Sequence, residues 1–493
     1  MFDFTTLYTL VVFSLMVLFL LWRPHGINES IPPTISAVFI FLAGIVPLSD
    51  LSKILGIVSG ASLTILSTIV MSIVLDSIGF FRWAAFNLVN RAKGSGVLLY
   101  WYILLLCFLM TMFFNNDGSI LITTPIIINI VIILKLKPHQ QFPYLFSGVL
   151  IATASSAPIA VSNLANLIAL KIVGLDINSY VSMMFVPSMV GIIAISLLLF
   201  YYFRKEIPKK IMVLPKSEIS DHSLSFASQP VEMKDHPHPH PHQNQPPHER
   251  PHPHPHPHLH PHYPHMHAPH LRAEKLPHPP VVETSMFKVC IAIVALIRAG
   301  LFIGAGLNIP IELIGIFGAL LLVGYRWHRM GVGVNDIIKK TPWHIILFAF
   351  SIYVVVYGLH NIGLTGMLVE LLRGPISVNH LSACLISGSL LTVMSNLFNN
   401  LPSVMIGTFT LVEMGLDTAT LQLAYMASIM GADIGSLITP MGTLATLIWM
   451  FLLRKNGIWV KWADIIKVTI MVIPIGLLIS LLSLFFWVEW LFF

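Results

Sequence analysis

The sequence FNNDGS at residues 114–119 recurs as FNNLPS at residues 398–403, 284 positions later. Each copy lies in the middle of a long apolar run, where a pair of amide side chains is poorly solvated by lipid. Polar groups at membrane depth are tolerated only where they face protein or a water-filled cavity. Two such interruptions in corresponding halves of one chain are typical of the solute-binding site of a secondary transporter.

The composition predicts a membrane protein. Of the 493 residues, 56% are hydrophobic and 10% are charged, and the mean hydropathy is +0.81, far outside the range of soluble proteins. A membrane span needs about 20 apolar residues, so the apolar runs predict roughly ten to twelve crossings plus re-entrant hairpins. The first run, residues 5–22, has no cleavage-like site after it and is predicted to be a retained span. We therefore expect a multi-pass protein of the cell (plasma) membrane.

The charged residues and cysteines exclude several function classes. The formal net charge of +6 reflects a Lys/Arg surplus that is typical of cytoplasmic loops, not nucleic-acid binding. Cys107, Cys290 and Cys384 are far apart and form no CxxC motif, so we expect buried small hydrophobic side chains rather than a thiolate site or disulfides.

One polar segment separates two apolar halves. We expect an N-terminal membrane half at 1–203, a cytoplasmic His/Pro-rich disordered loop at 204–286 and a C-terminal membrane half at 287–493. Fifteen histidines lie between His236 and His278, many of them in Pro-His repeats. They are interpreted as a weak site for a divalent transition metal, as an inert linker or as a pH sensor. The candidate ligands are His238, His240, His252, His254, His256, His258 and His260.

The two halves are related beyond the paired amides. LDSIGF at 75–80 matches LHNIGL at 359–364, again 284 positions later, and NLANLI at 163–168 matches TLATLI at 443–448. Three matches in the same order at nearly one offset indicate an internal duplication. The predicted fold is an all-α polytopic membrane protein, an inverted-repeat transporter with broken helices or re-entrant hairpins, divided into a scaffold and a transport domain.

Flanking charges predict the orientation of the two interrupted elements. Arg91 and Lys93 precede the first element, and Lys135 and Lys137 follow it, so both of its ends belong on the cytoplasmic side. The second element is followed by the acidic residues Glu413 and Asp417, with only Arg373 before it. We therefore expect it to open on the opposite side.

Polar residues of both halves are predicted to converge near the midplane. Their lining has many neutral donors and acceptors and no local Lys or Arg, which suits a small neutral polyhydroxy solute or a cation better than a polycarboxylate. For any single Ser or Thr, the alternative is a role in helix–helix packing. The candidate substrate-binding residues are Asn115, Asn116, Ser119, Ser155, Ser156, Asn163, Asn166, Asn399, Asn400, Ser403, Thr439 and Thr443.

Three carboxylates are candidates for proton coupling. Asp117 and Asp433 have apolar surroundings, where an ionised carboxylate is costly and proton exchange during a cycle is expected. Asp76 is the third, with a solvated cap or a local salt bridge as its alternative role. Arg298 is the strong intramembrane cation, interpreted either as snorkelling or as neutralising a carboxylate such as Asp117.

At these residues the chain resembles the arsenical pump membrane proteins, the ArsB family of the ion transporter superfamily. The resemblance covers nearly the whole chain except the His-rich loop. It rests on the stretches at 79–85, 116–126, 161–164, 202–208, 353–359, 399–402 and 431–447.

The resemblance implies efflux of arsenite and antimonite in exchange for protons, by an elevator-like motion and in some systems with a cytoplasmic arsenite-stimulated ATPase. By position it implies roles in substrate binding and proton coupling for Asn115, Asn116, Asp117, Asn399, Asn400 and Asp433. Arsenite near neutral pH is an uncharged trihydroxide that amides and hydroxyls can hold and release, whereas a tris-thiolate site would trap it. Family members carry Asp where this chain has Thr153, so one possible proton carrier is missing.

Two other functions stay open. A sodium/proton antiporter of the same superfamily could use Asp117 and Asp433, and only the longer motif matches argue against it. A membrane-anchored metal sensor would instead use the His-rich loop as its functional part. Dicarboxylate transport is less favoured, because the Ser-Asn-Thr signatures of the dicarboxylate transporters in this superfamily are absent from the chain.

Overall fold

The computed structural model describes residues 3–22, 27–212 and 284–492. The described part of the chain is helical and contains no named strand, and eleven of its helices are long and apolar enough to cross a membrane. The predicted all-α polytopic fold with roughly ten to twelve spans is therefore confirmed. The described residues belong to one compact unit. The His-rich tract lies outside the described residues, and the predicted domain boundaries stay a prediction.

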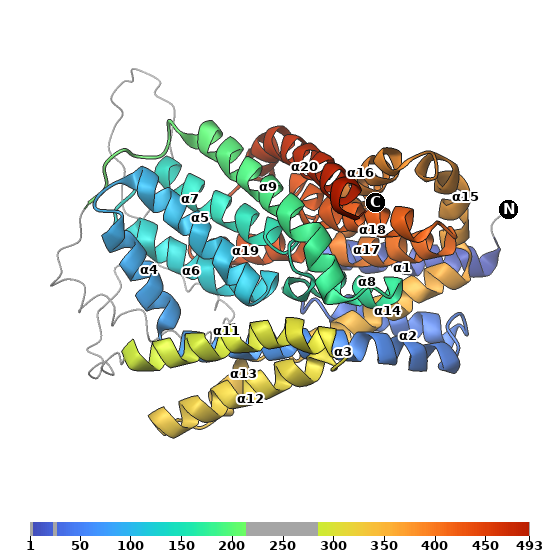
Figure 1. Cartoon of the computed structure of the whole chain (residues 1–493), viewed down its shortest axis with the longest axis horizontal. Helices are drawn as coiled ribbons and strands as arrows, with labels where there is room; N and C mark the ends of the chain where they lie inside the picture. Colours follow the sequence, from blue (N-terminus) through green and yellow to red (C-terminus); the bar gives the residue numbers. More distant parts are fainter. Residues whose placement is uncertain (1–2, 23–26, 213–283, 493) are drawn as a thin grey trace, which may run out of the picture. The chain divides into compact units, whose positions relative to one another are not determined.

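The helices fall into two series with the same order (Figure 1). The first series is α1 (Phe4–Trp22), α2 (Ile31–Leu42), α3 (Leu48–Ser77), α4 (Phe80–Arg91), α5 (Gly96–Phe113), α6 (Asn116–Ile133), α7 (Pro138–Ala154), the 3-10 turn η2 (Ala160–Ser162), α8 (Leu164–Val173) and α9 (Ile177–Phe203). The second is α11 (Thr284–Gly306), α12 (Ile311–Met330), α13 (Asn335–Lys340), α14 (His344–Asn361), α15 (Leu364–Ile376), α16 (His380–Phe398), α17 (Asn400–Glu413), α18 (Thr418–Asp433), the 3-10 turn η3 (Gly435–Ile438), α19 (Leu444–Lys455) and α20 (Trp462–Phe492). Apart from α13, each element of the second series has a counterpart in the first.

The sequence repeat places the same turn chemistry in both halves. Gly79 and Gly363 take left-handed backbone angles, φ 82° and 86°, where α4 and α15 begin. Such angles favour glycine, because a Cβ would be strained there. Asn115 and Asn399 occupy the N-cap positions of α6 and α17. The amides that interrupt the apolar runs therefore begin new helices, as the repeat predicts.

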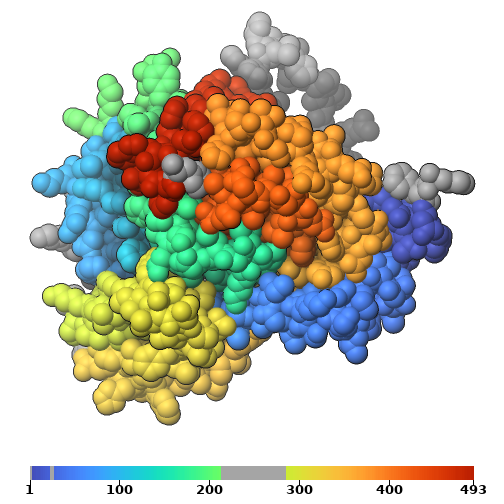
Figure 2. All heavy atoms as spheres, turned by 45° about the vertical axis from the view of Figure 1, so that its right-hand side comes forward, coloured from blue at the N-terminus to red at the C-terminus, as the bar shows by residue number. Residues whose placement is uncertain are grey.

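The two halves are interlocked in pairs. Within each half the broken segment forms a helical hairpin, α5 packed on α6 and α16 packed on α17. Across the halves, α8 packs on α17 and α19 on α6, while α2 packs on α14 and α12 on α3. Figure 2 shows α11 and α12 (yellow) grouped beside the blue segment that contains α3. Each repeat therefore completes the packing of the other.

The first hairpin, α5–α6, opens at the C-terminal end of α9. Ser95, at the start of α5, forms an isolated bridge with Lys210, just after α9 ends. The Tyr144 hydroxyl, near the start of α7, donates to the Gly96 carbonyl at 3.0 Å, so the end of α6 lies on the same side. The Lys/Arg-rich stretch at 204–210 assigns this side to the cytoplasm.

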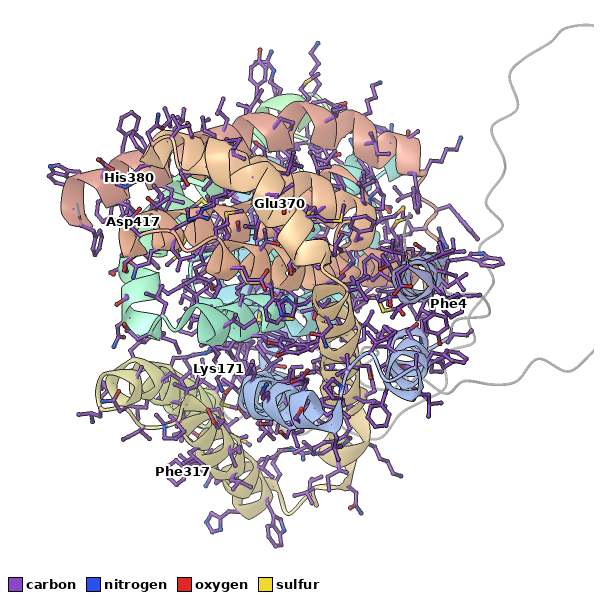
Figure 3. All side chains as sticks on the ribbon, turned by 90° about the vertical axis from the view of Figure 1, so that its right-hand side faces the viewer. Phe4, Lys171, Phe317, Glu370, His380 and Asp417 are labelled. Atoms are coloured by element: carbon purple, nitrogen blue, oxygen red, sulfur yellow. The ribbon has the colours of Figure 1, made fainter. Side chains whose placement is uncertain are left out.

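The second hairpin, α16–α17, opens at the other end of α9. The Trp487 indole N–H, near the end of α20, donates to the Ser182 carbonyl near the start of α9 at 2.9 Å. His380, the first residue of α16, pairs with Glu489 of α20 at 2.8 Å, and Figure 3 shows His380 close to Asp417. The 27 residues of α9 span about 40 Å, enough to cross a membrane. The two hairpins therefore open on opposite sides, which confirms the inverted repeat.

Candidate functional site

Asn115 and Asn399 shape the two hairpin tips. The Asn115 Oδ1 accepts the Gly118 N–H at 3.2 Å, which satisfies one of the free donors at the start of α6. A Cβ on Gly118 would lie 2.4 Å from that Oδ1, so a larger residue would displace the capping side chain. Asn399 takes φ 75° and its Nδ2 donates to the Met441 carbonyl at 3.2 Å. At each tip, therefore, an Asn side chain stabilises the turn by a hydrogen bond to the backbone.

A buried carboxylate joins the two halves. Asp433 ends α18 and is 1% exposed. Its two oxygens accept the side-chain N–H groups of Asn163 at 2.8 Å and Asn166 at 2.6 Å, both from the start of α8. The Tyr425 hydroxyl donates to the Asn166 carbonyl at 3.2 Å. Of the predicted site residues, these three form the most closely connected group.

Sequence reasoning missed Asn396. Its Nδ2 donates to the Gly435 carbonyl at 2.9 Å, and its Oδ1 accepts the Thr439 N–H at 2.8 Å. One amide therefore ties the η3 turn to α16, one helical turn before Asn399. The repeat comparison could not find it, because Met112 occupies the equivalent position in the first half. Its signal was an amide inside an apolar run.

The predicted hydroxyls mostly bond within their own segments. Ser119, Ser155 and Ser403 each donate to a carbonyl one turn earlier in the chain. Thr443 also bonds locally, with Thr446, whereas Thr439 reaches the Asn396 carbonyl of α16, 43 positions earlier. Ser156 donates to the Thr153 carbonyl and also has a side-chain hydrogen bond with Asp433. These contacts agree with the packing alternative for Ser and Thr, and only the oxygen lone pairs stay available for a solute. Asn400 donates its backbone N–H to Gly442 at 3.0 Å.

The carboxylates predicted beside Asp433 have different surroundings. Asp117 lies in the first turn of α6, is partly buried and has no hydrogen bond or ion pair among the described residues. Asp76 lies near the end of α3, in electrostatic range of Arg82 and Lys340. That environment favours the local ion-pair interpretation of Asp76. The structure does not bring the three carboxylates into one cluster.

Arg298 corrects the predicted lining. The expectation of no Lys or Arg beside the polar residues is wrong, because α11 places this guanidinium at the tip of the first hairpin. It neither snorkels nor pairs with a carboxylate among the described residues. Its Nε donates to the Phe113 carbonyl at 2.6 Å and its Nη2 to the Phe114 carbonyl. The carbonyls at the end of a helix lack intrahelical partners and carry partial negative charge, which explains the contact.

Several buried polar atoms near the interruptions have no hydrogen-bond partner in the described part of the chain. Because an unsatisfied buried donor or acceptor is costly, such atoms point to a polar ligand or water. They are Asn116 Oδ1, Asn166 Oδ1, Arg298 Nη1 and the hydroxyls of Ser162, Ser395 and Ser436.

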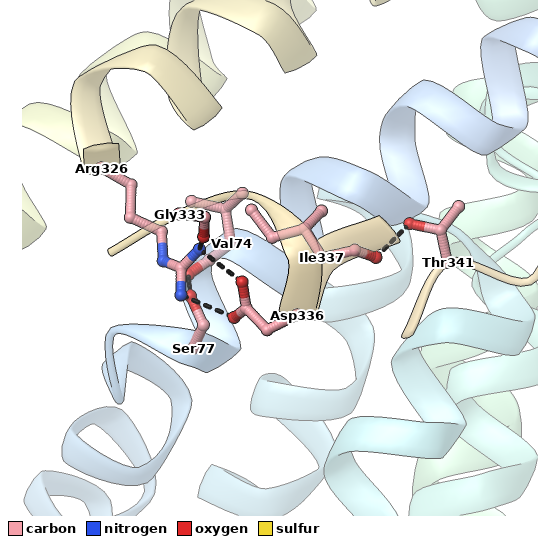
Figure 4. A network of polar contacts seen from close by, with 7 residues as sticks. All are labelled: Val74, Ser77, Arg326, Gly333, Asp336, Ile337 and Thr341. Atoms are coloured by element: carbon pink, nitrogen blue, oxygen red, sulfur yellow. Dashed lines mark hydrogen bonds and ion pairs between the residues drawn. The ribbon is translucent and has the colours of Figure 1, made fainter. Parts of the chain in front are cut away.

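A second buried guanidinium has a structural role. Arg326 of α12 pairs with Asp336 of α13 through two hydrogen bonds, of 3.0 and 2.6 Å (Figure 4). The bidentate geometry fixes α13 against α12. All of its contacts lie outside the two hairpins, so Arg326 provides a comparison for Arg298.

No group of three or more His, Cys, Asp or Glu suited to a metal ion occurs among residues 3–22, 27–212 and 284–492. The predicted histidine ligands lie outside these ranges. Cys107, Cys290 and Cys384 are buried on three different helices, as predicted.

Comparison with known proteins gives the family. The model of the citrate transporter family, CitMHS, matches residues 8–431. The chain belongs to this family. The chain is 44% identical to the putative arsenical pump membrane protein of Bacillus subtilis, over 98% of this chain and 100% of that protein. It is 28% identical to the arsenical pump membrane protein of Escherichia coli K12, over 94% of this chain and 95% of that protein.

The solved YdaH transporter of Alcanivorax borkumensis is similar in fold. The match has a TM-score of 0.52 at 12% identity and covers 93% of this chain and 98% of that chain. The family match and the eleven apolar helices of the described residues show that the chain is a multi-pass membrane transporter.

Proposed function

We propose that this CitMHS-family chain exports arsenite and antimonite across the cell membrane in exchange for protons. The observation that carries the proposal is the buried Asp433 carboxylate, held by Asn163 and Asn166 of the other half. The names of the similar proteins, arsenical pump membrane proteins, support the choice of solute.

The donor set suits a hydroxylated metalloid. Arsenite presents three oxygens that accept from amides and donate to carbonyl and carboxylate oxygens. The polar groups of the site are amides, hydroxyls, carboxylates and the Arg298 guanidinium, all of which would contact the oxygens of the solute by hydrogen bonds and can release it. The three cysteines are buried on α5, α11 and α16, apart from one another, so they do not form a tris-thiolate site that would bind arsenite tightly.

Asp433 is suited to couple the solute to protons. When ionised, it accepts two amide N–H groups, an arrangement that binding of a proton weakens. Those amides belong to α8, whose neighbour α17 begins at the second hairpin tip. Protonation of Asp433 would therefore loosen a contact between the two halves. Asp117 is the second candidate carrier, at the first tip.

Alternating access follows from the opposed hairpins. The first opens toward the cytoplasm and the second toward the other side. We propose that the hairpins, with α7, α8, α18 and α19, move as a transport domain against a scaffold of α2, α3, α12 and α14, in an elevator-like motion. Association with a cytoplasmic ATPase, and metal binding by the His-rich loop, stay predictions.

The test is arsenite uptake into everted vesicles under an imposed proton gradient. Asp433→Asn removes the titratable group and should abolish gradient-driven uptake. Asn166→Ala removes one charge-assisted hydrogen bond and should lower uptake by about tenfold. Asp50→Asn is the matched control, because Asp50 forms a local pair with Lys53. Wild-type vesicles without gradient-dependent uptake would refute the proposal, and full uptake by Asp433→Asn would remove Asp433 as carrier.

Citrate is the second candidate solute. The family model describes a citrate transporter, and Arg298 places a guanidinium at the first tip, where it could meet a carboxylate. The same vesicles distinguish the two solutes: labelled citrate should not accumulate if the arsenite proposal is correct.

A further inference from the structure

Arg298 is held in a fixed position between α11 and the first hairpin tip. Two of its three guanidinium nitrogens donate to the carbonyls of Phe113 and Phe114, where α5 ends. The side chain is only 7% exposed. A guanidinium is planar and rigid, so these two bonds also fix the direction of its third nitrogen.

Among the described residues, the second hairpin tip has no cation equivalent to Arg298. The repeat offset places Ser14 of α1 at the position equivalent to Arg298, and Ser14 is exposed. Its neighbour Phe13 packs instead on Phe398, the last residue of α16, with ring centroids 5.5 Å apart. The two hairpin tips therefore differ in chemistry: a cation supports the first and an aromatic contact supports the second.

Two buried polar atoms at the first tip are left without partners in the described part of the chain. One is Arg298 Nη1, a charged donor, and the other is Asn116 Oδ1, an acceptor two residues after Phe114. A buried guanidinium N–H without an acceptor is strongly disfavoured. A ligand oxygen that accepts from Nη1, on a molecule that also carries a hydroxyl for Oδ1, would satisfy both atoms.

We propose that Arg298 binds an oxygen of the transported solute through Nη1, while Nε and Nη2 hold the hairpin tip. The ligand class is a small oxyanion or oxyacid that carries at least one hydroxyl, such as arsenite in its neutral or singly deprotonated form. This inference rests on the proposed function for the identity of the solute. The role of Arg298 does not depend on that identity, since a hydroxycarboxylate such as citrate offers the same two groups.

The test measures arsenite and citrate binding to the purified full-length protein by calorimetry, in wild type, Arg298→Gln and Arg298→Lys. Gln loses the charge, and Lys keeps the charge but cannot serve three acceptors in a plane. Both variants should weaken binding of whichever solute the wild type binds by about tenfold or more. Arg326→Lys is the matched control and should leave affinity unchanged, because Arg326 pairs with Asp336.

A second measurement covers variants that fail to fold. In wild-type protein the bound solute should slow hydrogen–deuterium exchange in the peptides that cover Phe113–Asn116 and Arg298. Wild-type affinity in both folded variants, or solute binding that leaves exchange in both peptides unchanged, would overturn the inference. Binding of citrate but not arsenite would refute the proposed solute and leave Arg298 to be judged on citrate.

Discussion

At the scale of the residue, the first hairpin tip depends on Gly118, which has no Cβ. Gly118 lets the Asn115 side chain fold back and cap α6, because a Cβ would lie 2.4 Å from the capping oxygen. Small changes at this position should therefore alter the tip without changing the core.

Gly118→Ala should disrupt the Asn115 cap. Loss of an N-cap costs about 0.5–2 kcal/mol, so the protein should still fold, with a lowered melting temperature and reduced transport. Gly366→Ala in α15 is the matched control: no atom lies within 4 Å of its added Cβ, and alanine is favoured in a helix. Equal melting temperatures and equal transport in the two variants would contradict this account of the tip.

The paired amides were predictable as helix interruptions because each half repeats them at the same offset. The contacts of Arg298 and Asn396 could not be predicted, because their partners lie on other segments. The repeat gives no guide either, since neither residue has a like residue at the equivalent position of the first half. The link from Arg298 to Phe113 spans 185 positions. Only the folded chain brings such groups together, and this is why the predicted absence of a local cation was wrong.

At the scale of the element, the stability that a helix gains from an N-cap carboxylate just outside the membrane-spanning segment depends on pH. Asp417 is the N-cap of α18, and its Oδ1 accepts the Thr420 N–H at 3.0 Å. The hydrogen bonds from Thr420 hold the pKa of Asp417 below its usual range. A carboxyl with a lowered pKa in the folded state stabilises the fold above its unfolded pKa and loses that contribution as pH falls.

Asp417→Ala should therefore lower the melting temperature at pH 7 and make little difference near pH 3. Melting curves of both proteins across this range measure the effect. Asp464→Ala, in the first turn of α20, is the comparison, because the Asp464 carboxylate accepts no capping hydrogen bond among the described residues. A difference between wild type and Asp417→Ala that is constant with pH would contradict the capping role.

At the scale of the whole molecule, the two halves complete each other. Because α8 packs on α17 and α19 on α6, each hairpin is in direct contact with a helix of the other half. Asp433 with Asn163 and Asn166 lies in this shared region, so on the proposed function a change in its protonation is expected to affect both halves. The inverted repeat could be predicted from sequence periodicity and flanking charges. The interlocking could not, since it arises from contacts between distant segments.

The central claim is that solute movement is coupled to protons through this shared site. Its most direct test is the purified full-length protein in liposomes, with arsenite uptake and internal pH followed together. We predict that an arsenite gradient alone drives protons in the opposite direction, and that Asp433→Asn abolishes this proton movement. Arsenite flux with no proton movement in wild type, or proton movement that persists unchanged in Asp433→Asn, would contradict the account.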